Sequence, residues 1–240
     1  MKTEKGLAIV TGASQGIGAK ISIGLAEDGY QVVLIARNKS NLDKVCENIR
    51  NLDNDVSEPI ALPLDITDYE NVDREIKRIN IEYGKIDILV NSAAMFMDGS
   101  LNEPVENFKK IVDINIIAQY TILQTVTEIM RQQKSGYIFT IISRAAKYGF
   151  AGGGIYGSTK FALLGLTESL YRELAPLGIR LTSLCPGWVN TEMAKKAGTP
   201  FKDEEMVQPQ DLLDTIRYLL GLSKNVCIKE IVFEMEKSII

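Results

Sequence analysis

The sequence contains no histidine, and it has only three cysteines and one tryptophan among its 240 residues. The lack of histidine excludes Ser-His-Asp hydrolases, Cys-His proteases and histidine-ligated metal sites, so we expect no metal. It also removes the side chain that most often exchanges protons near neutral pH. Any acid/base chemistry must therefore use tyrosine, lysine, aspartate, glutamate or cysteine.

Long apolar runs are also absent from the sequence. No run approaches the roughly 18 residues that a membrane-spanning helix needs, and residues 1–6 show no hydrophobic region or cleavage site of a signal peptide. The cysteines (Cys46, Cys185 and Cys227) are odd in number and widely spaced, which is typical of reduced thiols rather than disulfides or zinc ligands. We therefore expect a cytoplasmic protein with no membrane partner.

The charge balance is mildly acidic, with a formal net charge of −4. A chain of this charge is a poor candidate for binding phosphate backbones, so we expect no nucleic acid partner. The hydrophobic content of 45% is ordinary for a globular protein. The length suits one large α/β domain, and we expect residues 1–240 to form a single domain.

Short apolar runs rich in β-branched residues alternate with longer segments of helical periodicity. The expected strands are 7–10, 31–35, 60–64, 86–90, 137–142, 179–184 and 231–233, and the expected helices are 16–28, 40–51, 69–82, 104–133, 156–175 and 209–220. Nearly continuous apolar strands are typical of parallel sheets buried on both faces. The pattern predicts an α/β Rossmann fold, a doubly wound parallel sheet of about seven strands with helices on both faces. Pro63 weakens the case for pairing of the third strand.

Two segments, 93–104 and 190–208, interrupt this alternation. Both follow the carboxyl ends of expected strands, where open α/β sheets bind their ligands. Long loops in compact domains are uncommon unless they are functional. We interpret 190–208 as a substrate lid, and the alternative is an ordinary surface excursion.

A glycine-rich turn follows the first expected strand and precedes the first helix, with the spacing Gly-x-x-x-Gly-x-Gly. Glycines allow a tight turn and a close approach of the backbone, and a helix N-terminus offers N–H groups to a pyrophosphate. The turn predicts a dinucleotide site, and the alternative is a purely structural turn. The residues expected to contact the cofactor here are Gly12, Ser14, Gln15, Gly16, Ile17 and Gly18.

The end of the second expected strand indicates which dinucleotide binds. NAD-preferring sites carry an acidic residue here for the ribose 2′-hydroxyl, but this chain has Ala36 followed by Arg37. An arginine binds a 2′-phosphate through charge-assisted hydrogen bonds, so we expect NADP(H) rather than NAD(H), with Asn38 beside it. The alternative for Arg37 is a solvated strand-end charge. Asp65, which Ile66 follows, is placed to accept from the adenine amino group or to cap the next helix.

Tyr156 and Lys160 are four residues apart in an expected helix, which places them on one face. A lysine ammonium beside a phenol stabilises the phenolate and lowers the phenol pKa from about 10. The tyrosine then becomes a usable acid or base near neutral pH. Most isolated pairs of this kind are surface residues. The catalytic interpretation of this pair therefore depends on the other motifs in the sequence.

In combination these motifs resemble those of the classical short-chain dehydrogenase/reductase family over essentially the whole chain. The shared pattern is Thr11-Gly12-x-x-x-Gly16-x-Gly18, Asp65, Asn91-Ser92-Ala93-Ala94, Asn115, Ser143, Tyr156-x-x-x-Lys160 and Pro186-Gly187-x-x-x-Thr191, in the family's order. The resemblance implies hydride transfer between NADP(H) and a carbonyl or secondary alcohol substrate. The hydride chemistry would belong to the cofactor, and the protein would position and polarise the reactants.

The resemblance also implies a role for each matching residue. Tyr156 would donate a proton to the carbonyl oxygen, and Ser143 would hydrogen-bond the same oxygen. Lys160 would bind the nicotinamide ribose and lower the Tyr156 pKa, and Asn115 would hold a water of a proton relay. The remaining cofactor contacts would come from Asn91 and Ala93 at the adenosine-side ribose and from Pro186, Gly187, Val189 and Thr191 around the nicotinamide.

The chain departs from the family pattern in three places. Ala94 stands where the family usually has glycine. Arg144 follows Ser143, and its charge either favours an anionic substrate group or points outward. The chain ends on Ile231-Val232-Phe233-Glu234 and a short tail, without the Val-Asp-Gly-Gly-type ending of many acyl-carrier-protein ketoreductases. This ending argues against that narrower function and its tetramer interface.

Two other functions compete with the oxidoreductase. A catalytically inactive NADP(H)-binding sensor typically lacks the catalytic tyrosine or lysine, whereas both are present here. An epimerase or dehydratase of the extended branch carries a further C-terminal domain, and too few residues follow Thr191 for one.

The resemblance implies a homodimer or homotetramer through helices 104–133 and 156–175. It leaves the small-molecule substrate open. The residues that indicate an apolar pocket are Met95, Phe96, Tyr148, Phe150, Trp188 and Met193.

Overall fold

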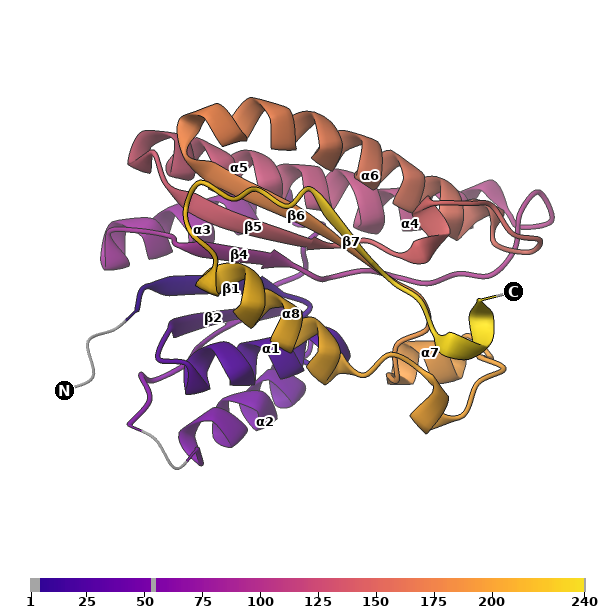
Figure 1. The fold of residues 1–240 in the computed structure, drawn as a ribbon, viewed down its shortest axis with the longest axis horizontal. Helices are drawn as coiled ribbons and strands as arrows, with labels where there is room; N and C mark the ends of the chain where they lie inside the picture. Colours follow the sequence, from indigo (N-terminus) through magenta and orange to yellow (C-terminus); the bar gives the residue numbers. More distant parts are fainter. Residues whose placement is uncertain (1–4, 53–54, 240) are drawn as a thin grey trace.

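The computed structural model describes residues 5–52 and 55–239, and in these ranges seven parallel strands form one sheet in the order β3-β2-β1-β4-β5-β6-β7 (Figure 1). The strands are β1 (Leu7–Thr11), β2 (Gln31–Ala36), β3 (Ile60–Pro63), β4 (Ile88–Asn91), β5 (Gly136–Ile141), β6 (Ile179–Pro186) and β7 (Glu230–Phe233). The helices are α1 (Gly16–Glu27), α2 (Lys39–Arg50), α3 (Tyr69–Tyr83), α4 (Val105–Val112), α5 (Ala118–Gln133), α6 (Gly154–Leu174), α7 (Glu192–Lys196) and α8 (Pro209–Gly221). The predicted doubly wound α/β fold is confirmed.

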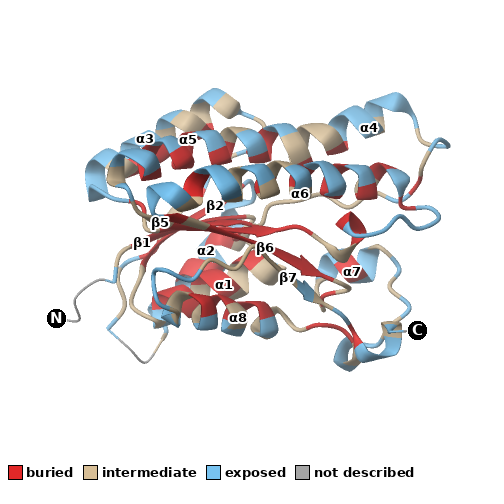
Figure 2. Cartoon of the chain, turned by 45° about the horizontal axis from the view of Figure 1, so that its top comes forward, coloured by how far each residue is buried: buried red, intermediate tan, exposed pale blue. Residues whose placement is uncertain are grey.

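Side chains of each strand alternate between the two faces of the sheet, because successive residues point in opposite directions. In β1, Ala8 and Val10 pack into the core beneath α1, α2 and α8, whereas Leu7 and Ile9 pack into the core beneath α3, α5 and α6. Figure 2 shows the buried residues following the sheet and the inner faces of the helices. The sheet is therefore buried on both faces, as its continuous apolar runs predict.

The strand order reverses at β1. The chain proceeds from β1 outward to β2 and β3, and then returns to the other side of β1 and continues from β4 to β7. Such a reversal opens a crevice at the carboxyl ends of the two central strands, β1 and β4. Both the glycine-rich turn and residues 92–104 begin at this crevice.

The expected helix 104–133 is interrupted in the structure. A π-helical segment, Asp113–Ile117, separates α4 from α5. Such segments are uncommon and occur frequently at functional sites. This one contains Asn115, which is completely buried. The apolar periodicity predicts helix throughout this region. It does not reveal the π-helical segment, because the α-helical pattern continues on both sides of it.

Pro63, which weakened the case for the third strand, is the last residue of β3 and is in register with Ala36 of β2. Because β3 lies at the edge of the sheet, no further strand requires the backbone N–H that proline lacks. The third strand is therefore paired as the other apolar runs are.

The expected lid, 190–208, contains α7 and a single 3-10 turn, so it is more ordered than a loop. Its two ends are held together, since the Asn190 N–H donates to the Val207 carbonyl (2.9 Å) and the Val207 N–H donates to the Trp188 carbonyl (3.0 Å). The segment thus forms a closed excursion beside the carboxyl ends of the strands.

No helix within residues 5–52 and 55–239 is both long and apolar enough to cross a bilayer. The prediction that residues 1–6 show no signal peptide includes residues 1–4, which lie outside the described residues.

Candidate active site

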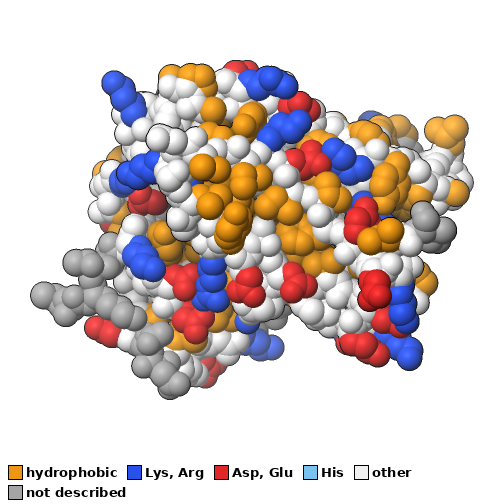
Figure 3. All heavy atoms as spheres, in the orientation of Figure 1, with side chains coloured by type: hydrophobic (Ala, Val, Ile, Leu, Met, Phe, Trp, Pro, Cys, Tyr) orange, Lys and Arg blue, Asp and Glu red, His pale blue; other side chains and the backbone are white. Residues whose placement is uncertain are grey.

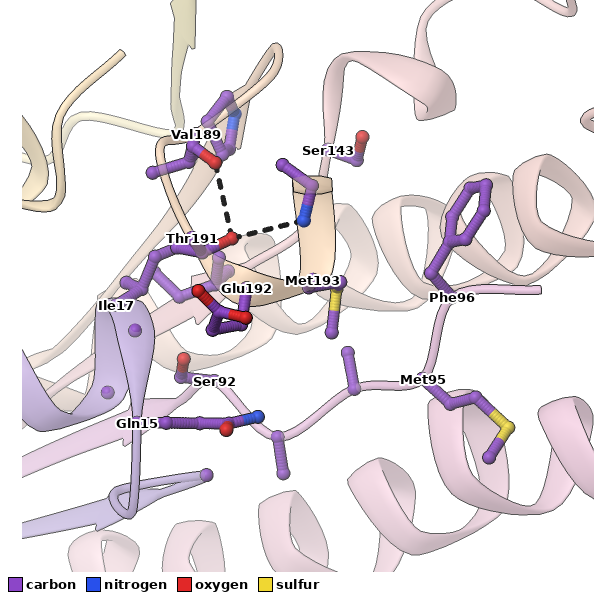
Figure 4. Close-up of a pocket in the computed structure, with 18 of the residues that line it drawn as sticks. Gln15, Ile17, Ser92, Met95, Phe96, Ser143, Val189, Thr191, Glu192 and Met193 are labelled. Atoms are coloured by element: carbon purple, nitrogen blue, oxygen red, sulfur yellow. Dashed lines mark hydrogen bonds between the residues drawn. The ribbon is translucent and has the colours of Figure 1, made fainter. Parts of the chain in front are cut away.

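A cavity of about 660 Å³ lies at the carboxyl edge of the sheet. The predicted site residues that line it are Gly12, Ser14, Gln15, Gly16, Ile17, Gly18, Arg37, Asn38, Asp65, Ile66, Ala93, Ser143, Tyr156, Lys160, Pro186, Gly187, Val189 and Thr191. Two further predicted residues, Asn91 and Asn115, are buried behind its wall. Figure 4 shows Gln15 and Ile17 at one end of the cavity and Ser143 and Phe96 at the other.

The N-terminus of α1 fits an anionic group. Its N-cap residue, Gln15, makes no side-chain cap hydrogen bond, and its first turn holds no acidic residue. By contrast, α2 and α3 are capped by the side chains of Asn38 and Asp68. The first N–H groups of α1 therefore remain available to a pyrophosphate, and the helix dipole favours its negative charge.

Two glycines allow the turn before α1 to approach its neighbours. Gly12 has a φ of +67°, and a Cβ there would lie 2.9 Å from the backbone nitrogen of Ala93. A Cβ at Gly18 would overlap the carbonyl oxygen of Gly12. A side chain at either position would push the turn away from the end of β4 or from α1. The turn therefore forms the close backbone cradle that a dinucleotide pyrophosphate requires.

Arg37 lies at the wall formed by the end of β2. Its Nη1 is 3.9 Å from a carboxylate oxygen of Asp65, and the two side chains are 65% and 46% exposed. This separation is too long for a hydrogen bond, so the guanidinium is accessible to a ligand. Asp65 does not cap α3, because Asp68 does so. It accepts instead from the backbone N–H (3.0 Å) and the hydroxyl (2.8 Å) of Thr67.

Tyr156, Lys160 and Ser143 are brought together at the other end of the cavity. Tyr156 and Lys160 lie one turn apart on α6, and the Lys160 Nζ is 5.6 Å from the centre of the Tyr156 ring. The Ser143 side chain acts on the Tyr156 phenol and lowers its pKa. Lys160 is only 2% exposed, and its ammonium donates to the Ile141 carbonyl at 3.3 Å.

Burial shifts the pKa values of these two groups in opposite directions. It raises the pKa of Tyr156 to about 12, against a smaller lowering by the hydrogen bond with Ser143. It lowers the pKa of Lys160 to about 8. Burial thus dominates the Tyr156 pKa in this structure. The expected lowering of that pKa depends on Lys160 together with a bound cofactor, and it stays a prediction. At neutral pH the site holds a phenol and an ammonium.

The side chain of Asn115 ties the loop after β4 to α6. Its Oδ1 accepts from the Met95 N–H (2.8 Å), and its Nδ2 donates to the Met95 carbonyl (2.8 Å) and to the Thr159 hydroxyl (3.1 Å). Both amide protons are thus used within the protein, and none is left to donate to the expected relay water. The side chain instead fixes the residues that flank Phe96 and Lys160.

Thr191 begins α7 and faces the cavity. Its hydroxyl donates to the Val189 carbonyl (3.2 Å) and accepts from the Ala194 N–H (3.4 Å), as the dashed lines in Figure 4 show. The hydroxyl therefore caps α7 in addition to lining the cavity.

Apolar side chains line the cavity around and beyond Ser143. Phe96 packs against the Tyr156 ring, with the ring centres 5.1 Å apart and the planes at 58°. The six residues from which the sequence predicts an apolar pocket, Met95, Phe96, Tyr148, Phe150, Trp188 and Met193, all line this cavity. They come from the loop after β4, the segment after β5 and the segment after β6.

Sequence reasoning missed several lining residues, among them Asn41, Ser92 and Glu192. Ser92 and Glu192 are adjacent in sequence to the predicted Ala93 and Thr191, and that adjacency was the signal that could have found them. Ala94, where the family usually has glycine, requires no special backbone. Among the described residues other than glycine, only Lys134 has a positive φ.

Comparison with protein families gives a match to the short chain dehydrogenase model over residues 6–200. Among curated proteins, an uncharacterized oxidoreductase of Staphylococcus epidermidis is 32% identical over 231 residues, which is 96% of this chain and 97% of the relative. An uncharacterized oxidoreductase of Staphylococcus aureus is 33% identical over 228 residues, or 94% and 95% of the two chains.

Three solved structures are similar over nearly their whole length. A β-ketoacyl-[ACP] reductase from Bacteroides thetaiotaomicron shares 71% identity, with a TM-score of 0.90 and 99% coverage of both chains. An alcohol dehydrogenase from Thermococcus sibiricus, complexed with 5-hydroxy-NADP, shares 27% identity (TM-score 0.86, 96% of both chains). A 7α-hydroxysteroid dehydrogenase, complexed with NADH and 7-oxoglycochenodeoxycholic acid, shares 26% (TM-score 0.86, 95% and 92%). The alcohol dehydrogenase structure thus holds an NADP derivative, and the hydroxysteroid dehydrogenase structure holds NADH.

Proposed function

This chain is an oxidoreductase of the short-chain dehydrogenase family, and on that premise we propose that it reduces a carbonyl compound to an alcohol with NADPH. The observation that carries the proposal is the arrangement of one cavity. One end holds Ser143, Tyr156 and Lys160, and the other holds the uncapped N-terminus of α1. A dinucleotide lying along this cavity would have its pyrophosphate at α1 and its nicotinamide near Tyr156.

The residues divide the chemistry among them. Bound NADPH supplies the hydride that the carbonyl carbon receives. The Tyr156 hydroxyl donates its proton to the carbonyl oxygen, which leaves an alcohol and a phenolate. Ser143 hydrogen-bonds the same oxygen and stabilises the charge that develops on it. The Lys160 ammonium stabilises the phenolate through its charge and passes it a proton, which solvent then replaces.

The protonation state of Tyr156 suits the role of acid in carbonyl reduction. At neutral pH the residue is a phenol with a proton to give, because burial raises its pKa to about 12. Lys160, with a pKa of about 8, remains cationic at neutral pH and can stabilise the phenolate that reduction creates.

The cofactor preference rests on Arg37. We propose that its exposed guanidinium binds the 2′-phosphate of NADP(H), with Asn38 and Asn41 beside it at the start of α2. Arg37→Ala is expected to weaken NADP⁺ binding by about 10-fold or more, because a hydrogen bond to a charged group contributes about 1.5–3 kcal/mol. Binding of NAD⁺ should change much less, since NAD⁺ carries no 2′-phosphate. Titration calorimetry with both cofactors measures the two affinities.

Lys39→Ala is the matched control for Arg37→Ala. Lys39 is an adjacent cation, but it pairs with Asp43 at 2.7 Å and does not line the cavity. Its loss should lower NADP⁺ affinity by no more than about 2-fold, as expected for a screened surface charge. Equal losses in the two variants, or an unchanged preference in Arg37→Ala, would contradict the assignment.

The substrate class is tested by a screen that follows NADPH consumption with neutral ketones, aldehydes and an acetoacetyl thioester. The thioester represents a narrower candidate, a β-ketoacyl reductase, which the 71% identity to a structure of that name favours. Consumption of NADPH with any carbonyl supports the oxidoreductase, whereas cofactor binding without turnover across the screen would favour the inactive sensor.

Segment 190–208 is proposed as the lid of this site. Met193 brings apolar surface from this segment to the cavity, and α7 also contributes Glu192 to its lining. A lid that carries part of the lining would exclude water when the cavity is filled.

We also propose a homodimer through α4, α5 and α6. Apolar side chains are exposed on this side, among them Phe108 (39%), Tyr120 (48%) and Phe161 (45%). Exposed aromatic residues of this kind are enriched at interfaces between chains. Light scattering at micromolar concentration should give a dimer or a larger oligomer, and Tyr120→Glu should shift it to a smaller species because a buried charge would be unpaired.

Tyr218 provides the control for this interface. It lies on α8, outside the proposed interface, and is 62% exposed. Figure 3 shows a patch of hydrophobic side chains near the middle of the face on which β7 and α8 lie. Tyr218→Glu should leave a dimer through α4, α5 and α6 intact. A monomeric wild type, or dissociation by Tyr218→Glu alone, would contradict the proposed interface.

A further inference from the structure

The charge of Arg144, the residue after Ser143, is paired with the C-terminal tail. Its guanidinium Nη1 forms an ion pair with Glu234 and donates to the Ser238 hydroxyl at 2.7 Å. The guanidinium carbon lies 5.5 Å from the centre of the Tyr148 ring. Arg144 also lines the cavity. The residue therefore faces the site, while its charge is paired with Glu234.

Glu234 reaches Arg144 from outside the cavity. It follows β7, and the chain then turns through Glu236–Ser238 beside α7, where Figure 1 shows the C-terminus. The side chains of Arg144 and Glu234 are only 19% and 33% exposed. An ion pair this far withdrawn from water is more persistent than a fully exposed one, because less solvent screens it.

The remaining wall around Arg144 offers nothing that would select a negative charge. The apolar set, Met95, Phe96, Tyr148, Phe150, Trp188 and Met193, lines the cavity. Within the described residues, the cations that line the cavity are Arg37, Arg144 and Lys160. Arg37 lies at the opposite end, and Lys160 is buried against Tyr156. Arg144 is thus the group at this end that a substrate carboxylate would have to use.

We propose that Glu234 is a specificity-determining residue, which occupies Arg144 and so makes the substrate pocket select neutral, apolar carbonyl compounds over those that carry a carboxylate. A free arginine in a partly dehydrated pocket binds a carboxylate through two parallel hydrogen bonds. An arginine that already holds Glu234 offers a second carboxylate little attraction and a repelling neighbour. Discrimination therefore comes from the unfavourable pairing as much as from apolar contact.

The inference rests on the proposed function in one respect, that the substrate enters the pocket beside Ser143 and Tyr156. Its test uses two probes of the same shape, para-formylbenzoate and its methyl ester, which differ in charge. Trp188 is the single tryptophan of the chain and lines the cavity, so its fluorescence reports probe binding without turnover. The ratio of kcat/KM for the two probes with NADPH gives an independent second readout.

Glu234→Gln is expected to shift the binding ratio towards the carboxylate by about 10-fold or more, as one charge-assisted hydrogen-bonded pair would. The matched control is Glu230→Gln, which breaks a similar ion pair with Lys147, a residue that does not line the cavity. That control should leave the ratio within about 2-fold, because surface charges are screened. An unchanged ratio in Glu234→Gln, or an equal shift in Glu230→Gln, overturns the proposal.

Glu234→Ala keeps the proposal testable if Glu234→Gln does not fold, and it should shift the ratio towards the carboxylate in the same way. Arg144→Gln combined with either change should abolish the gain, because no cation is then left for the carboxylate. A gain that survives in the double variant would overturn the proposal, because Arg144 would not be its source. A shifted fluorescence ratio without any NADPH consumption would refute hydride transfer and leave this inference standing.

Discussion

Tyr156→Phe is expected to lower kcat for carbonyl reduction by about 1000-fold, within the range that one general acid contributes. The variant loses a single oxygen, so the ring should still pack against Phe96, whose ring centre is 5.1 Å away. The loss should fall on kcat rather than on cofactor affinity, because the phenol acts when the carbonyl oxygen gains charge. Steady-state kinetics with NADPH and a substrate from the screen measures kcat, and fluorescence of Trp188 measures binding.

Tyr171→Phe is the control for this variant. Tyr171 lies on the same helix, and its hydroxyl donates to the Cys227 carbonyl at 3.4 Å, outside the cavity. Removal of that oxygen should leave kcat within about 2-fold, as for most changes away from a site. If Tyr156→Phe kept more than about a tenth of the wild-type kcat, another group would have to be the proton donor.

Lys160→Met is expected to change activity and stability in opposite directions. Activity should fall at least about 100-fold, because the phenolate left by proton transfer loses its cation. Stability at pH 7 should rise by about 3 kcal/mol, because burial lowers the Lys160 pKa from 10.5 to about 8 and each pKa unit corresponds to about 1.4 kcal/mol. Lys160 is 2% exposed, so solvent relieves little of this cost.

The pH dependence of this gain identifies its cause. Between pH 8 and 10.5 the unfolded chain holds the Lys160 proton while the folded protein has released it, so wild-type stability rises with pH relative to the variant. The gain of Lys160→Met should therefore be full below pH 8 and disappear towards pH 10.5. Urea unfolding of both proteins at pH 7 and pH 10 measures the change, and any packing difference cancels.

Lys44→Met, on the exposed side of α2, controls for loss of a surface lysine. Its effect should stay within about 0.5 kcal/mol at both pH values. A Lys160→Met protein that is destabilised equally at pH 7 and pH 10 would mean that the ammonium is not strained by its burial.

The parts of the site that sequence could predict are those in which local pattern and position coincide. The turn from Gly12 to Gly18 was predictable because it follows a buried strand directly, and because a Cβ at Gly12 or Gly18 would meet neighbouring backbone. Tyr156 and Lys160 were predictable because a helical spacing of four places two side chains on one face. The sheet was predictable because residues buried on both faces are apolar throughout.

Other features depend on partners distant in the sequence, and no local pattern reveals them. Glu234 meets Arg144 across a separation of 90 residues. Asn115 is held by Met95 and Thr159 through a π-helical segment that resembles ordinary helix in its periodicity. The direction of the Tyr156 pKa depends on how much water the folded chain removes, and this effect outweighs the lowering by Ser143.

Transfer of deuterium from NADPH that carries deuterium at both positions of its reduced nicotinamide carbon tests the central claim most directly. Mass spectrometry of the alcohol product would locate the label. The account predicts one deuterium on the carbinol carbon with the wild-type protein, and a rate of label transfer about 1000-fold lower with Tyr156→Phe. A product without deuterium, or equal rates of transfer by the two proteins, would contradict it.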